Sequence, residues 1–478
     1  MLFNSLSFLI FFPVTLLLYF ILPVRFKNFS LLILSYVFYM GWNSKYALLL
    51  LFCTAVTYGA SLLINGIEFD NKKRVFVLIL ALVVVLSILF YFKYLNFILG
   101  LIKNFVAANG FESSIPHFDI ILPVGISFFT FQSIGYLIDV YRGDVEVEKN
   151  FFTYALFVSF FPQLVAGPIE RSHNLLKQLK VVHDFEFYNL KSGLITMCWG
   201  YFMKMVVADR ASILVDFVFN NKNSTGIQVM FAVFVFAFQI YCDFCGYSTI
   251  AVGASRILGI KLMQNFDAPY LASGFQDFWR RWHISLSSWF KDYIYIPLGG
   301  NRKGTVRKYL NIIIVMFISG IWHGAGINYI FWGLLNGVLQ VADSVIKPVK
   351  KHVNKIILIL FNFALVCFTW LFFRAKSMTH AVSLIKKILF DLQPCSLKGD
   401  FKKIYGIGGI EISVMLLTII LLVTVDIIRC KKISVRSVVL SKHWTVQALC
   451  FVLFVLFILV FGVWGGNYNP ASFIYFQF

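Results

Sequence analysis

The residue least suited to its surroundings is His323, which interrupts a long apolar stretch, NIIIVMFISGIWHGAGINYIFWGLLNG. Three glycines lie close to it, Gly320, Gly324 and Gly326, and such residues loosen or break a helix and let other groups approach the backbone. An ionisable side chain at membrane depth is costly and commonly serves a transport pathway, a proton relay or catalysis. A core histidine bonded to a neighbouring helix is the alternative that this stretch leaves open.

A second histidine, His283, precedes His323 in the segment FQDFWRRWHISLSSWFKDYIYIPLGGNRKG. Its neighbours are aromatic and basic, namely Trp279, Arg280, Arg281 and Trp282. Such side chains settle at the interface between membrane and water, so an interfacial anchor is one interpretation of this segment. Arginine also binds phosphate groups and tryptophan stacks on flat ligands, which favours a cytoplasm-side collar for an anionic donor such as acetyl-CoA.

Two such histidines suit acyl or proton transfer, because imidazole titrates at about pH 6.5 and can accept a proton from an attacking hydroxyl. The sequence contains no G-x-S-x-G elbow, no H-E-x-x-H zinc motif and no G-K-[ST] phosphate loop. Cys242 and Cys245 have the spacing of a metal pair, but they lie alone in an apolar run, so we expect packing and no metal. Asp243 lies between them, and we expect it to orient a histidine or, preferably, to pair with an arginine.

The composition indicates an integral membrane protein. Hydrophobic residues make up 59% of the 478 residues and charged residues 13%, against about 25% charged in soluble proteins. Since a span needs about 20 apolar residues, the recurring apolar runs predict an all-α polytopic fold with roughly 10–13 transmembrane and re-entrant helices. The net charge of +20 does not indicate nucleic acid, because the lysines and arginines cluster beside apolar segments and favour contact with membrane lipid.

The basic clusters also predict sidedness. Placing Arg25 and Lys27 in the cytoplasm puts the N-terminus outside. The cluster at 429–436 is also expected in the cytoplasm, so the last span, which follows it, runs from the cytoplasmic to the outer side. The tail at 465–478 is therefore expected at the extracytoplasmic face.

Three segments are expected to differ from simple spans. If the clusters at 302–308 and 347–355 are both cytoplasmic, the His323 segment enters and returns as two half-helices. Prolines and glycines inside 121–143 and 160–171 predict irregular backbone, which survives at membrane depth only inside protein or along a cavity.

The segments around the two histidines resemble those of the membrane-bound O-acyltransferase (MBOAT) superfamily. More narrowly, they resemble its AlgI-like bacterial branch of alginate O-acetylation proteins, with D-alanyl transferases as cousins. The resemblance covers essentially the whole chain, including LPVGISFFTFQSIGYLIDVYRG, FFPQLVAGPIER, YCDFCGYSTIAVGASRILGI and WLFFRA. It implies one MBOAT domain over 1–478, a ring of helices around a central tunnel, and a catalytic core region at 275–345.

The resemblance also implies roles for single residues. His323 matches the essential intramembrane histidine of the family, and His283 matches its second, cytoplasm-side histidine. Other side chains are expected to support the histidines (Asp243, Trp322, Asn328) or to line a funnel for the donor (Trp279, Arg280, Arg281, Trp282).

The tail FIYFQF resembles a C-terminal aromatic motif found in this branch. The resemblance implies that the hydroxyl of Tyr475 accepts the acyl group near His323 and relays it to an extracytoplasmic enzyme. The alternative is an aromatic residue that anchors the terminus at the membrane interface.

We therefore expect a multi-pass acyltransferase of the bacterial cytoplasmic (inner) membrane that acts in the O-acetylation of an exported or cell-surface polysaccharide. Acetyl-CoA or another acyl thioester is the expected donor substrate, with no bound cofactor. The expected partner is an extracytoplasmic acetylase. D-alanyl transfer, peptidoglycan acylation and, in a different class, a proton-coupled transporter stay open as alternatives.

Overall fold

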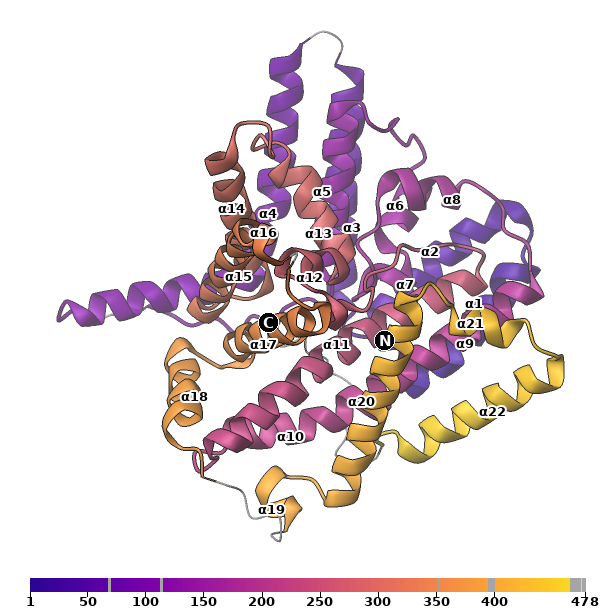
Figure 1. Ribbon diagram of the computed structural model, residues 1–478. Helices are drawn as coiled ribbons and strands as arrows, with labels where there is room; N and C mark the ends of the chain where they lie inside the picture. Colours follow the sequence, from indigo (N-terminus) through magenta and orange to yellow (C-terminus); the bar gives the residue numbers. More distant parts are fainter. Residues whose placement is uncertain (68–69, 112–114, 351, 394–399, 465–473, 475–478) are drawn as a thin grey trace. The chain divides into compact units, whose positions relative to one another are not determined.

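The computed structural model describes residues 1–67, 70–111, 115–350, 352–393, 400–464 and 474. Over these residues the chain forms helices and connecting turns, without strands, which confirms the all-α prediction (Figure 1). The chain divides into two compact units, the first comprising 1–186 with 258–263 and the second 187–257 with 264–478. The single domain over 1–478 stays a prediction.

The first unit contains five helices of 16 or more residues followed by shorter ones. Their bounds are α1 Leu6–Ile21, α2 Val24–Met40, α3 Lys45–Gly66, α4 Asn71–Ala108, α5 Ile126–Arg142, α6 Phe151–Ser159, α7 Phe161–Leu164, the π-helical η1 Ser172–Leu176, and α8 Lys177–Leu179. The backbone at 121–125 and at 165–171 is outside these helices, and residues 160–172 are all buried. The expected irregular backbone is therefore found at 165–171, where it is enclosed by protein, but in the first segment it is limited to 121–125, because residues 126–142 form the regular helix α5.

The second unit contains both histidines and is organised around one long buried helix, α11, Gly226–Ile257. The other elements are α9 Phe187–Tyr201, the π-helical η2 Phe202–Ala208, α10 Asp209–Asn220, η3 Pro269–Leu271, α12 Phe275–Arg281, α13 Ile284–Phe290, η4 Lys291–Tyr295, α14 Thr305–His323, α15 Ile327–Val345, α16 Lys347–Lys350, α17 Lys355–Arg374, α18 Met378–Phe390, α19 Phe401–Tyr405, α20 Gly409–Cys430, α21 Val435–Leu440 and α22 Trp444–Phe461. All residues of the predicted catalytic core region, 275–345, belong to this unit.

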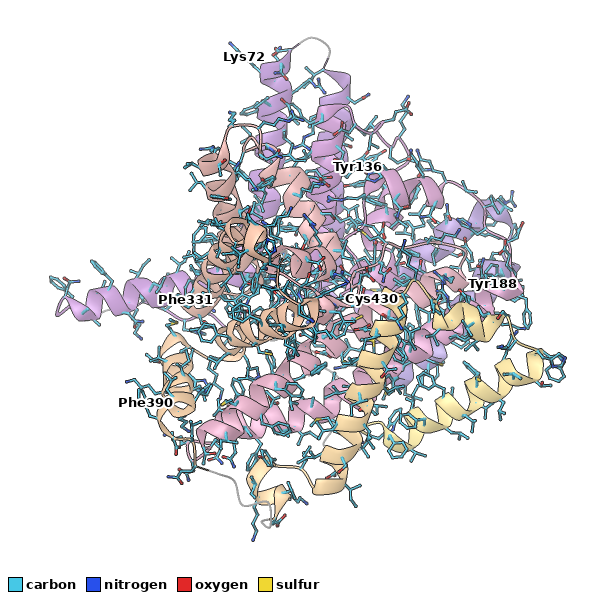
Figure 2. All side chains as sticks on the ribbon, in the orientation of Figure 1. Lys72, Tyr136, Tyr188, Phe331, Phe390 and Cys430 are labelled. Carbon is cyan, nitrogen blue, oxygen red and sulfur yellow. The ribbon has the colours of Figure 1, made fainter. Side chains whose placement is uncertain are left out.

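Seven helices among the described residues are long and apolar enough to cross a membrane, namely α3, α4, α11, α14, α17, α20 and α22. Many of their large apolar side chains face outward, as lipid-facing surfaces require. In the shorter helix α18, the last residue, Phe390, labelled in Figure 2, is likewise 83% exposed. The protein is therefore a multi-pass membrane protein, and any passages beyond these seven would use shorter or more polar helices such as α1.

The prediction of two half-helices around His323 is wrong. α14 and α15 have 19 residues each, and a helix of that length spans about 28 Å at 1.5 Å per residue, close to the thickness of the hydrocarbon core. The prediction failed because α14 begins at Thr305, so Arg307 and Lys308 belong to its first turns although they interrupt the apolar run. Their aliphatic stems can still lie against apolar surface.

The two helices form an antiparallel pair that depends on glycine (Figure 1). Gly333 of α15 faces Met316 and Gly320 of α14, and further along Gly337 faces Ile313. A Cβ atom added at Gly333 would lie 2.4 Å from the carbonyl oxygen of Met316. Small residues allow such close backbone approach between membrane helices, and this approach fixes the end of α14, where His323 lies.

We expect Gly333→Ala to destabilise the protein, because the added methyl group meets backbone atoms that cannot move aside as a side-chain end can. The cost of such overpacking is about 1–3 kcal/mol. Gly59→Ala in α3 is the matched control, since a Cβ there has no other atom within 4 Å and alanine favours a helix. Thermal unfolding in detergent measures both, and equal or higher stability of Gly333→Ala would contradict this account of the helix pair.

Candidate active site

His323 is the last residue of α14 and only 3% exposed. Aromatic rings from three helices surround its imidazole. The ring centroids of Trp322 in α14, Trp332 in α15 and Phe373 in α17 lie 4.9, 5.0 and 5.4 Å from it, each in an edge-on arrangement. This aromatic box shields the imidazole from bulk water, as chemistry on a hydrolysable acyl group requires.

The walls of the box are themselves packed. The indole of Trp332 stacks on that of Trp370 at 5.9 Å and an interplanar angle of 16°. Asn328 in the first turn of α15 donates hydrogen bonds to the carbonyls of Phe372 (3.3 Å) and Ala375 (2.9 Å) at the end of α17. Asn328 therefore joins two helices of the box and satisfies backbone acceptors that the helix end leaves open.

His283 lies between α12 and α13 and is fully buried. Its backbone is left-handed, with φ of 44°, which is uncommon for a residue other than glycine. Its Nδ1 lies 3.2 Å from Oδ1 of Asn265, the same oxygen that accepts bonds from the backbone N–H and the hydroxyl of Ser285. Because an amide oxygen only accepts, Nδ1 carries the hydrogen and Nε2 is the basic nitrogen.

Trp322 brings the two histidines into one cluster. Its ring centroid lies 6.0 Å from that of His283 and 4.9 Å from that of His323. Phe244 of α11 packs edge-on against His283 from the other side, at 4.6 Å. The structure therefore joins two motifs that the sequence could only place far apart along the chain.

The four residues predicted to line the donor funnel differ in their exposure. Trp279 donates a hydrogen bond of 3.3 Å to Asn336, and Trp282 is 1% exposed in an aromatic cluster. Arg281 forms an ion pair with Asp277 at 3.1 Å, whereas Arg280 is exposed. The tryptophan rings are thus covered by protein, whereas the arginines reach the surface.

Asp243 pairs with a lysine, not with the arginine that we expected. Its Oδ1 lies 2.6 Å from the ammonium of Lys204, which also lies 2.8 Å from Oδ1 of Asp209. Sequence analysis passed over Lys204 although it is a single cation inside the apolar run YFMKMVVA. Asn265 was also missed, because it belongs to no recognisable local motif, and Trp332 was missed although it lies in the quoted stretch around His323, because its type and spacing alone do not show which ring it contacts.

The remaining predictions for the site concern metals and the tail. Cys242 and Cys245 are buried thiols without a disulfide. Within the described ranges no group of three or more His, Cys, Asp or Glu side chains is placed to hold a metal ion. Tyr475 lies outside the described residues, so its predicted role rests on the sequence alone.

The burial of His283 predicts a pH dependence of stability. Burial lowers the pKa of His283 from its ordinary 6.5 to about 3, so the folded protein resists a protonation that the unfolded chain accepts. The stability contributed by this group is complete above about pH 6.5 and is lost as the pH falls toward the folded-state pKa, by about 1.4 kcal/mol per pH unit.

We expect His283→Gln to remove this part of the acid sensitivity. The difference in unfolding temperature between wild type and variant, measured in detergent from about pH 7 to about pH 5, should shrink on acidification. Parallel pH curves for the two proteins would contradict a neutral, buried His283.

Comparison with known proteins agrees with the sequence motifs. The family model described as "MBOAT, membrane-bound O-acyltransferase family" matches residues 145–381, a range that contains both histidines. A probable alginate O-acetylase AlgI of Pseudomonas putida is 33% identical over the full length of both chains. A peptidoglycan O-acetyltransferase of Helicobacter pylori is 38% identical over 81% of this chain and 79% of its own length.

A more distant relative is the teichoic acid D-alanyltransferase of Bacillus subtilis, 27% identical over 55% of this chain and 71% of its own length. The resemblance to the AlgI-like branch therefore extends further along the chain than the resemblance to D-alanyl transferases. The family match, together with the full-length P. putida relative and the H. pylori relative that covers about four fifths of each chain, shows that the chain belongs to the membrane-bound O-acyltransferase family.

Proposed function

We propose that the protein is an O-acetyltransferase that moves acetyl groups from a cytoplasmic thioester to an exported or cell-surface polysaccharide. The observation that carries this proposal is the imidazole of His323, enclosed by aromatic rings at the end of a membrane helix in a chain of this family. The names of the P. putida and H. pylori relatives both denote acetyl transfer, which favours acetyl as the acyl group. Acetyl-CoA is the simplest donor with the required thioester.

In the proposed reaction His323 acts as general base. It takes the proton of the attacking hydroxyl as that oxygen bonds to the thioester carbonyl. The carbon–sulfur bond of the resulting tetrahedral intermediate breaks, and the leaving thiolate takes the proton back from the imidazolium. Atoms and charge balance without a further reactant, and the aromatic box limits hydrolysis by excluding water.

His283 and the arginines have different proposed roles. Because burial keeps His283 neutral and Asn265 holds its Nδ1–H, its Nε2 is left as the basic nitrogen, which we propose accepts a hydrogen bond from the bound donor. Arg280 and Arg281 provide positive charge for the phosphates of the donor. Trp279, Trp282, Trp322 and Asn328 are proposed to hold the geometry through packing.

The proposed sidedness is that both termini are extracytoplasmic in a bacterial inner membrane. The antiparallel packing of α14 and α15 supports a common cytoplasmic side for the basic clusters at 302–308 and 347–355, because the start of α14 and the end of α15 lie at the same end of the pair. The tail at 465–478 would meet a partner acetylase at the outer face. Tyr475 would carry the acyl group to that partner.

A second candidate acceptor is peptidoglycan, because the H. pylori relative bears that name and is the more identical of the two acetylating relatives. D-alanyl transfer has less support, since the B. subtilis relative matches a smaller share of this chain. A proton-coupled transporter is not favoured for a member of an acyltransferase family.

We expect His323→Ala to lower acetyl transfer roughly 100-fold or more, the usual effect of losing a general base. Membranes containing the protein are incubated with acetyl-labelled CoA and either alginate-like polysaccharide or peptidoglycan, and label on protein and glycan is counted. His173→Ala is the control, because His173 is an exposed histidine of the first unit. Equal activity of His323→Ala and wild type would refute the assignment of the base, and labelling only from a D-alanyl thioester would refute the donor.

Tyr475→Phe removes one hydroxyl and should abolish label on the protein if Tyr475 is the relay. Tyr468→Phe in the same tail is the matched control and should keep the label, because it removes a hydroxyl that is assigned no chemistry. Digestion and mass spectrometry locate the acetyl group. If label persists on the Tyr475→Phe protein, the proposed acyltransferase activity still stands, but Tyr475 is not the relay.

A further inference from the structure

Lys204, Asp209 and Asp243 form a buried charge network in the second unit. The ammonium of Lys204 lies 2.6 Å from Oδ1 of Asp243 and 2.8 Å from Oδ1 of Asp209, and all three side chains are at most 5% exposed. One cation thus faces two carboxylates. Buried charges are tolerated when hydrogen bonds satisfy their remaining lone pairs, so the second oxygen of Asp243 needs a donor.

That donor comes from the end of the chain. The backbone N–H of Ile474 donates a hydrogen bond of 2.7 Å to Oδ2 of Asp243. Ile474 is itself only 2% exposed. A hydrogen bond to a carboxylate is stronger than one between neutral groups, and here it joins residues 231 positions apart in the sequence.

The chain that follows α22 contacts the same region a second time. The backbone N–H of Val463 donates to the carbonyl of Met205 at 3.1 Å, and the guanidinium of Arg210 donates to the carbonyl of Phe461 at 2.6 Å. Met205 belongs to η2, as Lys204 does. The backbone is therefore held by this region both just after α22 and at Ile474.

The local structure of η2 suits such a contact. Residues 202–208 are π-helical, a rare conformation that is frequent at functional sites. Gly246 of α11 lets this segment approach, because a Cβ atom there would lie 2.8 Å from the carbonyl oxygen of Gly200 and 3.0 Å from the backbone nitrogen of Lys204. The close approach brings the ammonium of Lys204 to Asp243, one turn earlier on α11.

We propose that η2 and Asp243 form an anchor site for the chain's own C-terminal segment, and that Asp243 is a positioning residue for the end of the chain. Tyr475, the proposed relay residue, follows Ile474 directly in the sequence. The residue after Asp243 is Phe244, whose ring contacts His283. The part of this proposal that concerns acyl transfer rests on the proposed function, whereas the anchor itself does not.

Two matched pairs of variants test the anchor. Asp243→Ala and Asp209→Ala each remove one carboxylate from Lys204 and leave it the other, and the carboxylate that accepts the hydrogen bond of Ile474 is that of Asp243. Ile474→Pro removes the donated N–H and leaves the charge network intact, whereas Ile474→Val keeps the N–H and a buried apolar side chain. Unfolding temperatures in detergent verify that the variants being compared are folded.

The first readout is independent of activity. Carboxypeptidase shortens the purified full-length protein from its C-terminus, and intact-mass spectrometry follows the products. We expect trimming of the Asp243→Ala variant past residue 474 to be at least about 10-fold faster than trimming of wild type or Asp209→Ala, the change expected for losing a hydrogen bond to a charged group. Equal trimming of all three proteins would overturn the anchor.

The second readout is acetyl label on the protein and on glycan. Asp243→Ala and Ile474→Pro should lower it together, while Asp209→Ala and Ile474→Val should retain it. Faster trimming of Asp243→Ala with full acetyl transfer would overturn the positioning role and leave only a structural anchor. If the wild-type protein transfers no acetyl group, the proposed function is refuted. The trimming assay would still show whether Asp243 holds the C-terminal segment.

Discussion

The close contact between α14 and α15 is the constraint on which the active-site geometry depends. Gly320 and Gly333 allow two backbones to approach so closely that an added methyl group would overlap a carbonyl oxygen. This approach places His323, at the end of α14, against Trp332 of α15, and α17 then completes the aromatic box with Phe373. In lipid no hydrophobic effect drives helices together, so close packing of this kind has to provide the association.

The second unit holds its polar groups in internal partnerships. Asn265 binds both His283 and Ser285, and Asn328 joins α15 to the end of α17. Lys204 is shared between two aspartates. Each bond avoids the cost of a buried polar group without a partner, and each also connects segments that are distant in the sequence. The same bonds that stabilise the fold therefore orient the groups proposed for catalysis.

The arrangement suggests that His323 and His283, which lie in one aromatic cluster, have different roles. His323 is the proposed base inside the aromatic box, while His283 stays neutral and is held by Asn265. The end of the chain is held by a different set of side chains around η2 and Asp243. Chemistry and delivery of the acyl group would thus depend on separate residues, which is why variants can distinguish them.

Local sequence determined that the protein is helical and membrane-embedded, that it has an MBOAT signature, and that His283 and His323 are its exceptional residues. These features are readable because hydropathy and motif spacing are properties of neighbouring residues. The full length of α14 and α15, the Lys204 partner of Asp243, the Asn265 partner of His283 and the Trp332 wall were decided only by the tertiary structure. The three contacts depend on how closely separate helices or loops approach one another, and no pattern within a single segment encodes that distance. The length of α14 was missed because Arg307 and Lys308 interrupt the apolar run although they belong to the helix.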